Sequence, residues 1–171
     1  MALKREERVY EYFKMSDIHF TGVICTYIDA MWVQGKISES MFTRLVDLYA
    51  IAAIVGLRIR RRLSADTREQ KRTVPLAQIS NNYSTLIPIM RLILLLDESR
   101  GLSVEQRVDS AFRNPETQEE YERNMELFNS YARGGVEYLY QQLVMQEPTE
   151  GDEHENKTIS NMIALLEKPL L

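Results

Sequence analysis

The segment SESMFTRLVDLYAIAAIVGLRIRRR, residues 38–62, has the pattern of one long helix. From Met41 to Tyr49, apolar residues recur about every 3.6 positions, which places them on one helical face. Polar residues should continue along the opposite face, but Ile51 and Ile54 occupy it instead. We therefore expect a helix over 39–62 whose second half is apolar on all sides. Such a helix either lies at the centre of its own fold or is covered by another chain.

A second apolar helix is expected over residues 85–98, where Arg91 is the only charged residue before Asp97. A chain of 171 residues is too short to enclose two such helices completely. We therefore infer that part of their surface is covered by another chain. We also expect Arg91 to pair with a carboxylate such as Asp29 or Asp47, or with an acid of the partner.

The remaining segments also show helical periodicity, and none has strand-like alternation of useful length. A long helix is expected to begin at Asn114-Pro115, with Asn114 as its cap and Pro115 as its first residue, and Gly134-Gly135 within it indicates a kink or a close helix crossing. The predicted fold is a compact all-α bundle of five to seven helices, with the two apolar helices at its centre. Further helices are expected over 3–14, from the cap residues Ser16 and Asp17 to Gly35, and from Ser103, in a capping box with Gln106, to Phe112.

Composition and charge indicate one globular domain followed by a separate helix. The chain has 44% hydrophobic and 27% charged residues, as ordinary globular proteins do, and its net charge of −4 gives no overall attraction to nucleic acid. We predict a helical bundle domain over 1–146, an acidic linker over 147–157 and an amphipathic helix over 158–171. The linker has five acidic residues and no Lys or Arg between Glu147 and Glu155. The last helix must bury its apolar face by folding back or by docking on a neighbour.

The sequence indicates an intracellular protein. Its single cysteine, Cys25, excludes an internal disulfide framework and fits a reducing compartment. The charged start, MALKREER, lacks the apolar core of a signal peptide. The longest apolar runs, Leu48–Leu57 and 85–96, are shorter than the roughly 20 residues that span a bilayer. We therefore expect a cytoplasmic protein with no transmembrane segment.

Catalytic and metal-binding patterns are absent from the sequence. The two histidines, His19 and His154, are far apart, and neither belongs to a His-Glu-x-x-His or Cys-x-x-Cys pattern. No phosphate-binding glycine loop and no Gly-x-Ser-x-Gly motif occurs. Acidic pairs such as Glu122 and Glu126 are typical of a solvated helix face, although carboxylates could bind a divalent ion. We predict no catalytic residue, no metal site and no cofactor, and an enzyme with a carboxylate site is the third hypothesis.

A basic loop over residues 58–75 is the strongest local indication of a partner. Arginine side chains bind phosphates in a bidentate manner, and a flexible cationic segment gains affinity for nucleic acid by releasing counterions. The same loop could instead pair with acids of its own chain, such as those of the linker. We expect an exposed loop or flexible arm whose candidate residues for nucleic acid or another anionic partner are Arg58, Arg60, Arg61, Arg62, Arg68, Lys71 and Arg72.

The other candidate site is an apolar protein interface, which could also be simple core. Our leading hypothesis is a non-catalytic assembly or adaptor subunit that forms a homo-oligomer or docks on a larger protein complex. The alternative is a nucleic-acid-binding accessory subunit that uses the basic arm, residues 58–72. The candidate interface residues are Ile51, Ile54, Val55, Ile87, Arg91, Leu94, Ile159, Met162, Ile163 and Leu166.

Overall fold

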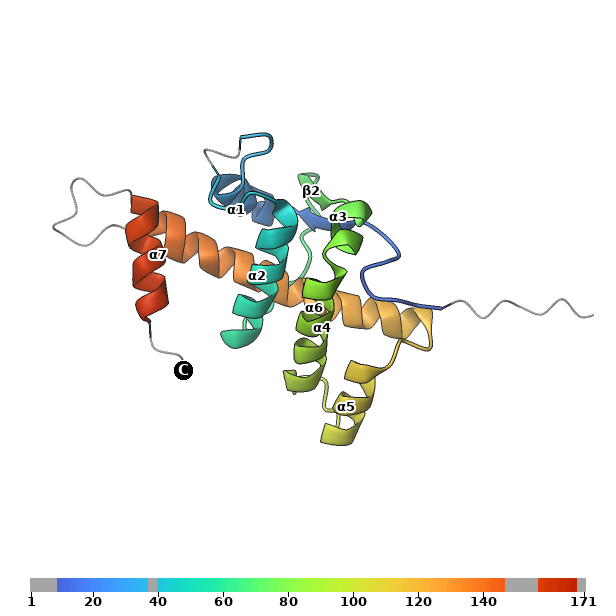
Figure 1. Cartoon of the computed structure of the whole chain (residues 1–171). Coiled ribbons are helices and arrows are strands. Elements are labelled where there is room, and N and C mark those ends of the chain that lie inside the picture. Colours follow the sequence, from blue (N-terminus) through green and yellow to red (C-terminus); the bar gives the residue numbers. More distant parts are fainter. Residues whose placement is uncertain (1–8, 37–39, 147–156, 169–171) are drawn as a thin grey trace, which may run out of the picture.

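The computed structural model describes residues 9–36, 40–146 and 157–168. Over these residues the chain forms seven α-helices and one two-stranded sheet, which confirms the predicted helical bundle (Figure 1). A π-helical turn, Gln141–Met145, extends α6 at its C-terminal end. The elements in chain order are β1 (Ile18–Thr21), α1 (Val23–Met31), α2 (Leu45–Arg58), β2 (Lys71–Val74), α3 (Leu76–Asn81), α4 (Tyr83–Leu96), α5 (Val104–Phe112), α6 (Gln118–Tyr140) and α7 (Lys157–Glu167).

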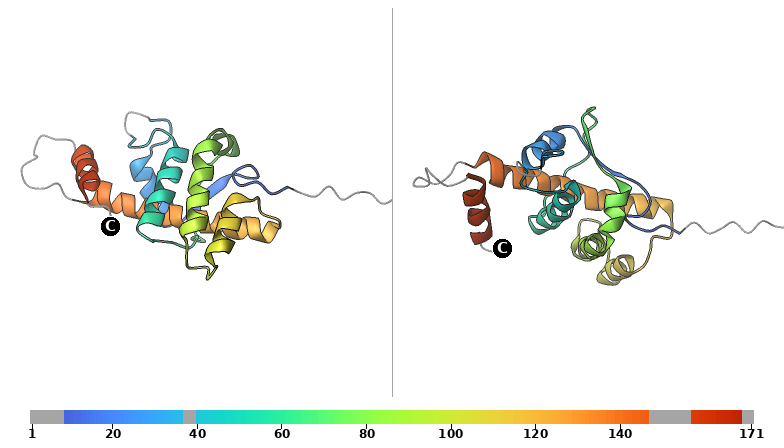
Figure 2. Two further views of the ribbon diagram at one scale, coloured as in Figure 1. Left: turned by 60° about the horizontal axis from the view of Figure 1, so that its bottom comes forward. Right: turned by 45° about the horizontal axis from the view of Figure 1, so that its top comes forward.

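Helix α6 lies at the centre of the bundle. It has 23 residues, and the other helices cross or flank it along its length (Figure 1, Figure 2). Residues 130–136 are all buried, so α6 is enclosed on every side there. The sequence does not predict this central position for α6, and the two apolar helices predicted over 39–62 and 85–98, α2 and α4, pack against it. Ser130 and Arg133 give α6 a solvated appearance in the sequence, but both are buried, and they donate hydrogen bonds to backbone carbonyl oxygens over 2.7 Å.

Small residues set the distance between α2 and α6. A Cβ atom on Gly135 would lie less than 3.0 Å from the main-chain oxygen of Ala52, and one on Gly56 would lie less than 3.0 Å from the main-chain oxygen of Tyr131. Only glycine therefore allows the two backbones to meet at these positions. The close helix crossing predicted at Gly134-Gly135 is confirmed, and α6 continues through both glycines as one helix.

A buried polar network joins the end of α4 to α6. Asp97, which is 2% exposed, accepts a hydrogen bond of 3.1 Å from the Tyr131 hydroxyl. Its other carboxylate oxygen lies 3.5 Å from Nε of Arg100, and Arg100 donates to the carbonyl oxygen of Leu94 over 2.8 Å. Burial and the Asp97 charge raise the pKa of Tyr131 to about 12. The network keeps the buried charge of Asp97 beside the half-buried charge of Arg100 and binds a carbonyl oxygen in the last turn of α4.

The N-terminal part of the chain differs from the predicted helices. Residues 9–14, the described part of the predicted helix 3–14, are not helical. Residues 18–21 form β1 rather than the first turn of a helix, and β1 pairs antiparallel with β2 so that Ile18 lies opposite Val74. Each strand has only four residues, which is too short for an alternating pattern to stand out from a helical one.

Two predicted helix starts are also wrong. Helix α2 begins at Leu45 and has no side-chain cap. Ser40, which lies inside the predicted helix 39–62, instead accepts a hydrogen bond of 2.8 Å from the backbone nitrogen of Val33, beyond the end of α1. Helix α6 begins after Thr117, whose hydroxyl accepts from the nitrogen of Glu120 over 3.1 Å, rather than at Asn114-Pro115. Residues that can cap a helix are also common in loops, so the sequence offers several possible helix starts. Tertiary contacts determine which of them is used.

Other boundaries agree more closely with the sequence analysis. The capping box of Ser103 and Gln106 is confirmed at the start of α5. The helix predicted over 85–98 is α4, which begins at Tyr83 and follows a short helix, α3, that was not predicted. Helix α7 spans most of the predicted 158–171. The acidic linker, apart from Lys157, lies outside the described residues.

Candidate protein-binding groove

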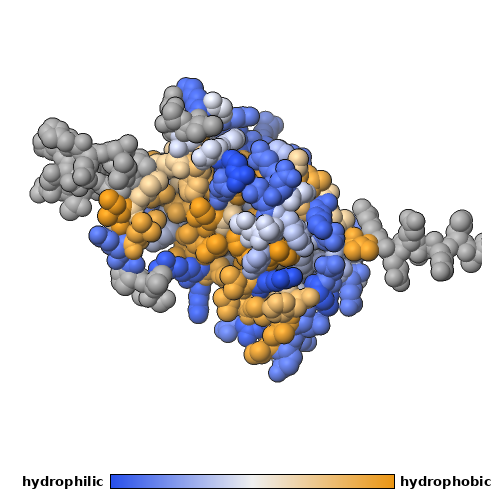
Figure 3. Space-filling view, viewed as in Figure 1, coloured by the Kyte–Doolittle hydropathy of each residue, from blue (hydrophilic) through white to orange (hydrophobic). Residues whose placement is uncertain are grey.

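A groove of about 1030 Å³ lies between α2 and α7 and reaches the end of α6. The two helices stand on the same side of α6 (Figure 1), and hydrophobic residues gather over this region of the surface (Figure 3). The groove thus has an apolar lining drawn from three separate parts of the chain. The lining residues are Ile51, Val55 and Ile59 from α2 and its end, Tyr138 and Leu139 from α6, and Leu165 and Leu166 from α7.

Helix α2 contributes large side chains to this surface because its small ones face α6. Ala52, Ala53 and Gly56 are buried, and Ala52 and Gly56 lie at the α6 crossing. Ile51 and Ile54 lie on other sides of the helix and are 43% and 45% exposed. The second half of α2 is therefore apolar all round, as the sequence predicts, but only part of it is covered by its own chain.

A buried asparagine holds α7 against the end of α6. Asn161 is 4% exposed, and its Nδ2 donates to the carbonyl oxygens of Leu143 and Gln146, over 3.1 Å in each case. These carbonyl oxygens lie at the C-terminal end of α6 and its π-helical turn, where no following helical residue supplies a backbone N–H group to bind them. Leu166, in the last turn of α7, is 85% exposed. Helix α7 is thus fixed near its middle, and its C-terminal half forms an open wall of the groove.

One end of the groove is cationic, because Arg58, Arg60 and Lys168 line it. Arg58 ends α2 and Lys168 follows α7, and both helices run toward this end (Figure 1). Lys168 donates a hydrogen bond to the side-chain amide oxygen of Gln142. This amide carries no net charge, so the bond does not neutralise the lysine. No carboxylate is among the described residues that line the groove. The groove therefore combines an apolar wall with a positively charged end.

The structure separates the residues of the predicted apolar interface. Ile51 and Val55 line the groove, and Ile54 is exposed on the same helix. Ile87 is half-buried and packs against the core. Leu94 is fully buried, so its inclusion in an interface was wrong. Helical spacing placed Ile87 and Leu94 with the exposed residues, but they face inward on α4.

Arg91 pairs with neither Asp29 nor Asp47, the two carboxylates of its own chain that the sequence suggests. Its guanidinium lies over the ring of Phe112, 5.5 Å from the ring centroid, in a cation–π contact between α4 and α5. The two carboxylates proposed as its partners, Asp29 and Asp47, bind other arginines. Arg91 is exposed, so its charge needs no buried partner.

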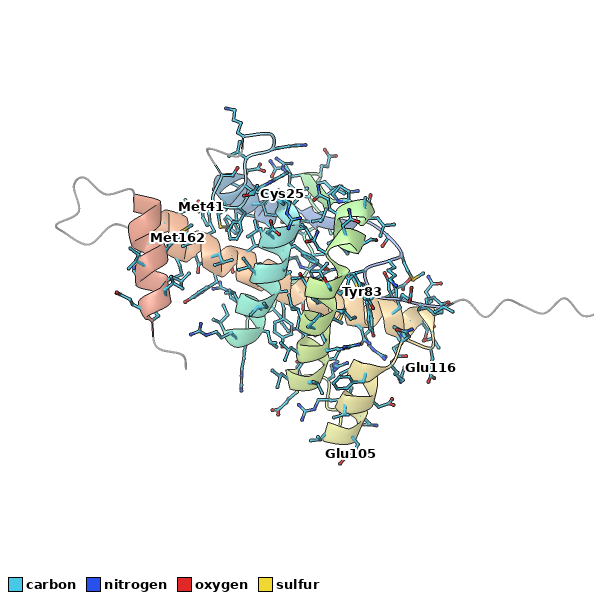
Figure 4. The ribbon with its side chains drawn as sticks, viewed as in Figure 1. Cys25, Met41, Tyr83, Glu105, Glu116 and Met162 are labelled. Carbon is cyan, nitrogen blue, oxygen red and sulfur yellow. The ribbon has the colours of Figure 1, made fainter. Side chains whose placement is uncertain are left out.

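The predicted interface residues of α7 divide between the core and the surface. Leu166 lines the groove, and Ile163 is 48% exposed. Met162 is half-buried and packs against the core beside α6 (Figure 4). Ile159 lies within α7, but its side chain is outside the described part of the structure. The C-terminal helix therefore folds back on its own chain and still leaves apolar surface uncovered.

The residues of the predicted basic arm lie in two separate parts of the structure. Lys71 and Arg72 belong to β2, which lies at the other end of α2 from Arg58 (Figure 1). Arg72 forms a bidentate ion pair with Asp29, with contacts of 2.5 and 2.7 Å. The expectation of a flexible arm is therefore wrong for this part, because residues 71–74 pair with β1.

Most of the other arginines in this segment also bind groups of their own chain. Arg61 forms an ion pair with Glu137, and Arg62 donates to the hydroxyls of Ser130 and Ser99, over 3.2 and 2.5 Å. Arg68 pairs with Asp66 over 2.6 Å. Pairing with the chain's own acids, the alternative interpretation of the basic loop, accounts for the contacts of Arg61 and Arg68, although these acids are not those of the linker. Arg62 binds hydroxyl groups instead.

Asp66 fastens this loop to the start of α1. Its carboxylate accepts from the backbone nitrogens of Val23, over 3.3 Å, and Arg68, over 3.0 Å. The Thr21 hydroxyl donates to the Asp66 carbonyl oxygen over 2.5 Å. Hydrogen bonds from the side chain and backbone of Arg68 lower the pKa of Asp66 to about 2. A charged carboxylate thus holds a segment that had no periodic pattern to predict its structure.

A second uncovered apolar surface, the α4–α5 patch, lies over α4 and α5 (Figure 3). Sequence reasoning missed it, because periodicity shows which residues share a helical face but not whether that face is covered. The buried residues of α5 are Ser110 and Ala111. The α4–α5 patch consists of Leu92, Leu96, Val104, Val108 and Phe112, each at least 44% exposed.

Two groups typical of catalytic sites, the His19 imidazole and the Cys25 thiol, are engaged or buried in the described structure. His19 Nδ1 lies 3.0 Å from the Thr73 hydroxyl, and desolvation lowers the pKa of this histidine. Cys25 is fully buried, and burial raises the pKa of its thiol, which disfavours the reactive thiolate. Within residues 9–36, 40–146 and 157–168, no three His, Cys, Asp or Glu side chains come together to hold a metal. No helix in these ranges has the length and hydrophobicity needed to cross a membrane.

Comparison with protein-family models, curated proteins and solved structures finds no match for this chain.

Proposed function

We propose that this protein is a non-catalytic helical assembly or adaptor subunit that binds another protein chain in the groove between α2 and α7. The observation that carries the proposal is the groove's apolar wall, in which Ile51 is 43% and Leu166 is 85% exposed. Large apolar side chains gathered in a surface groove are typical of a protein-binding site. The α4–α5 patch adds a second surface of the same kind, which suits a subunit with more than one neighbour.

The apolar lining favours a protein partner over nucleic acid. Nucleic acid binding needs a continuous basic surface that follows phosphates. The candidate cations are split between the two ends of α2, and 14 helical residues separate the ends by roughly 20 Å. Arg61, Arg62, Arg68 and Arg72 are also engaged with their own chain. The groove combines exposed apolar side chains with cationic ones.

The test compares wild-type protein with a groove variant, Leu166→Glu. Leu166 is so exposed that the variant should fold normally, but a charge in the groove should prevent an apolar partner from docking. Sedimentation velocity measures self-association, and affinity purification from the source cell, followed by intact-mass measurement, identifies other partners. The matched control is Val9→Glu, which introduces the same charge at a residue 68% exposed and outside the groove.

We expect wild type and Val9→Glu to retain the same bound chain and Leu166→Glu to lose it. A wild-type protein that stays monomeric at high micromolar concentration and has no recovered partner would contradict the proposal. A partner that Leu166→Glu retains would show that the groove is not the binding site.

A further inference from the structure

The groove has a polarity that restricts what can lie in it. Helices α2 and α7 both end at its cationic end, where Arg58 and Lys168 are located. The C-terminal end of a helix carries a partial negative charge and its N-terminal end a partial positive charge. A helix lying antiparallel between α2 and α7 therefore places its positive N-terminal pole beside their two negative poles. The cations at the same end repel that pole, so the antiparallel orientation requires acidic side chains in the first turn of the bound helix to offset the repulsion.

The cations at this end favour acidic side chains in the first turn of such a helix. Aspartate and glutamate in a first turn are already stabilised by the positive end of their own helix dipole. Here they would also face Arg58, Arg60 and Lys168, and no carboxylate among the described lining residues would repel them. Charge complementarity of this kind sets orientation and specificity more than raw affinity.

The walls of the groove suit an apolar helical face. Ile51 and Val55 on α2 are one turn apart, and Leu165 and Leu166 present apolar side chains from the opposite wall. A helix with apolar residues at positions i, i+3, i+4 and i+7 presents a continuous stripe to such walls. The floor adds Leu139, which is 3% exposed and so gives a rigid base.

We propose that the groove receives an amphipathic helix of a partner protein, with an acidic first turn, lying antiparallel to α2 and α7. This inference rests on the proposed function of the groove as a protein-binding site. It adds the secondary structure, charge and direction of the bound segment.

The experiment uses three labelled helical peptides and the full-length protein, with fluorescence anisotropy as the measurement. All three peptides share one apolar stripe. The first has glutamates in its first turn, the second has the same glutamates in its last turn, and the third has lysines in its first turn. We expect the first peptide to bind about tenfold more tightly than the third and more tightly than the second.

A charge-reversal variant shows whether the groove causes this preference. Arg60→Glu should weaken binding of the first peptide about fivefold or more and strengthen binding of the lysine peptide. Lys71→Glu makes the same type of charge reversal on β2, outside the groove, and should leave the order of affinities unchanged. Leu166→Glu should weaken binding of all three peptides, because they share the apolar stripe.

Equal affinities for the first and third peptides, tighter binding of the second peptide, or no binding of any peptide would overturn the inference. A dimer of the protein that Leu166→Glu abolishes and that excludes the peptides would overturn it too, because the occupant would then be a second copy. In that last case the proposed function stands. It also stands if no peptide binds but Leu166→Glu still loses a partner purified from the cell, so the two proposals can fail separately.

Discussion

Helix α2 makes two contacts of opposite character. Toward α6 it presents Ala52 and Gly56, and the two backbones meet closely enough to exclude a Cβ atom at Gly135. Toward α7 it presents Ile51 and Val55, which line an open groove. Both sides of the helix are apolar, so hydrophobicity does not distinguish them. The size of the side chains does, because small residues let a neighbouring helix approach and large ones leave room for a further chain.

The closed side of α2 should therefore determine stability, and the open side should determine binding. The following substitutions test this difference, in order of decreasing effect.

Gly135→Ala should have the largest effect on stability. The added Cβ would lie less than 3.0 Å from a backbone oxygen of α2, which cannot move aside as a flexible side chain can. We expect a loss of about 4 kcal/mol or more in the free energy of unfolding. Thermal unfolding followed by circular dichroism should show a fall in Tm of about 10 °C or more.

Gly101→Ala is the matched control for that variant. Gly101 has a φ of 66°, but nothing lies within 4 Å of the position of its Cβ. The substitution should therefore cost only about 1 to 2 kcal/mol of backbone strain. Equal losses in the two variants would show that the close crossing does not control stability.

Asp97→Ala removes the buried network between α4 and α6 and should lower the free energy of unfolding by about 3 kcal/mol, because it leaves the half-buried charge of Arg100 without its carboxylate. Urea denaturation measures this loss. The substitution should also move the pKa of Tyr131 down from about 12 toward 10.0, since the Asp97 charge contributes to the rise. Ultraviolet titration of tyrosinate measures that shift. Glu98→Ala, at a neighbouring side chain that is 78% exposed, should change neither quantity appreciably.

The same network predicts how stability depends on alkaline pH. The pKa of Tyr131 is raised to about 12 in the folded protein and is 10.0 ordinarily. Its contribution is therefore complete below pH 10.0 and is lost as the pH rises through about 12. Tyr131→Phe should remove this particular decline, and an unchanged alkaline profile in that variant would assign the decline to other groups.

Asp66 should show the opposite dependence, at acidic pH. Its pKa is about 2 in the folded protein against an ordinary 3.8, so the stabilisation is complete above pH 3.8 and is lost as the pH falls toward 2. The carbon-13 chemical shift of its carboxyl group should titrate near pH 2. Arg68→Ala should raise that midpoint toward 3.8, because the Arg68 side chain is the largest cause of the shift. A midpoint that stays near 2 would mean that other donors hold the carboxylate.

Leu166→Ala, on the open side, should have the smallest effect on stability. Its side chain is 85% exposed, so we expect a change of less than about 0.5 kcal/mol. Leu139→Ala makes the same substitution on the floor of the groove, where the side chain is 3% exposed, and should cost about 2 kcal/mol or more. Chemical denaturation of both variants measures the difference. A large loss for Leu166→Ala would mean that the outer wall belongs to the core.

The candidate site could be predicted only in part. The sequence predicts Ile51 and Leu166 as residues of a protein interface. It predicts Arg58 and Arg60 as residues of a different, anion-binding site. The structure places all four around one groove. The sequence does not predict Tyr138 and Leu139 as groove residues, because apolar residues that line a groove have the same helical spacing as apolar residues of the core. No local signal shows that segments 51–60, 138–139 and 165–168 lie together.

Local sequence was sufficient for the helical class, the two most apolar helices, the capping box at Ser103 and the close crossing at Gly134-Gly135. These features depend on periodicity and on the conformational freedom of single residues. Packing between distant segments was needed to place α6 at the centre, to pair the two short strands and to leave one side of α2 open. Those outcomes depend on side-chain size and on contacts between residues far apart in the chain, which periodicity does not contain.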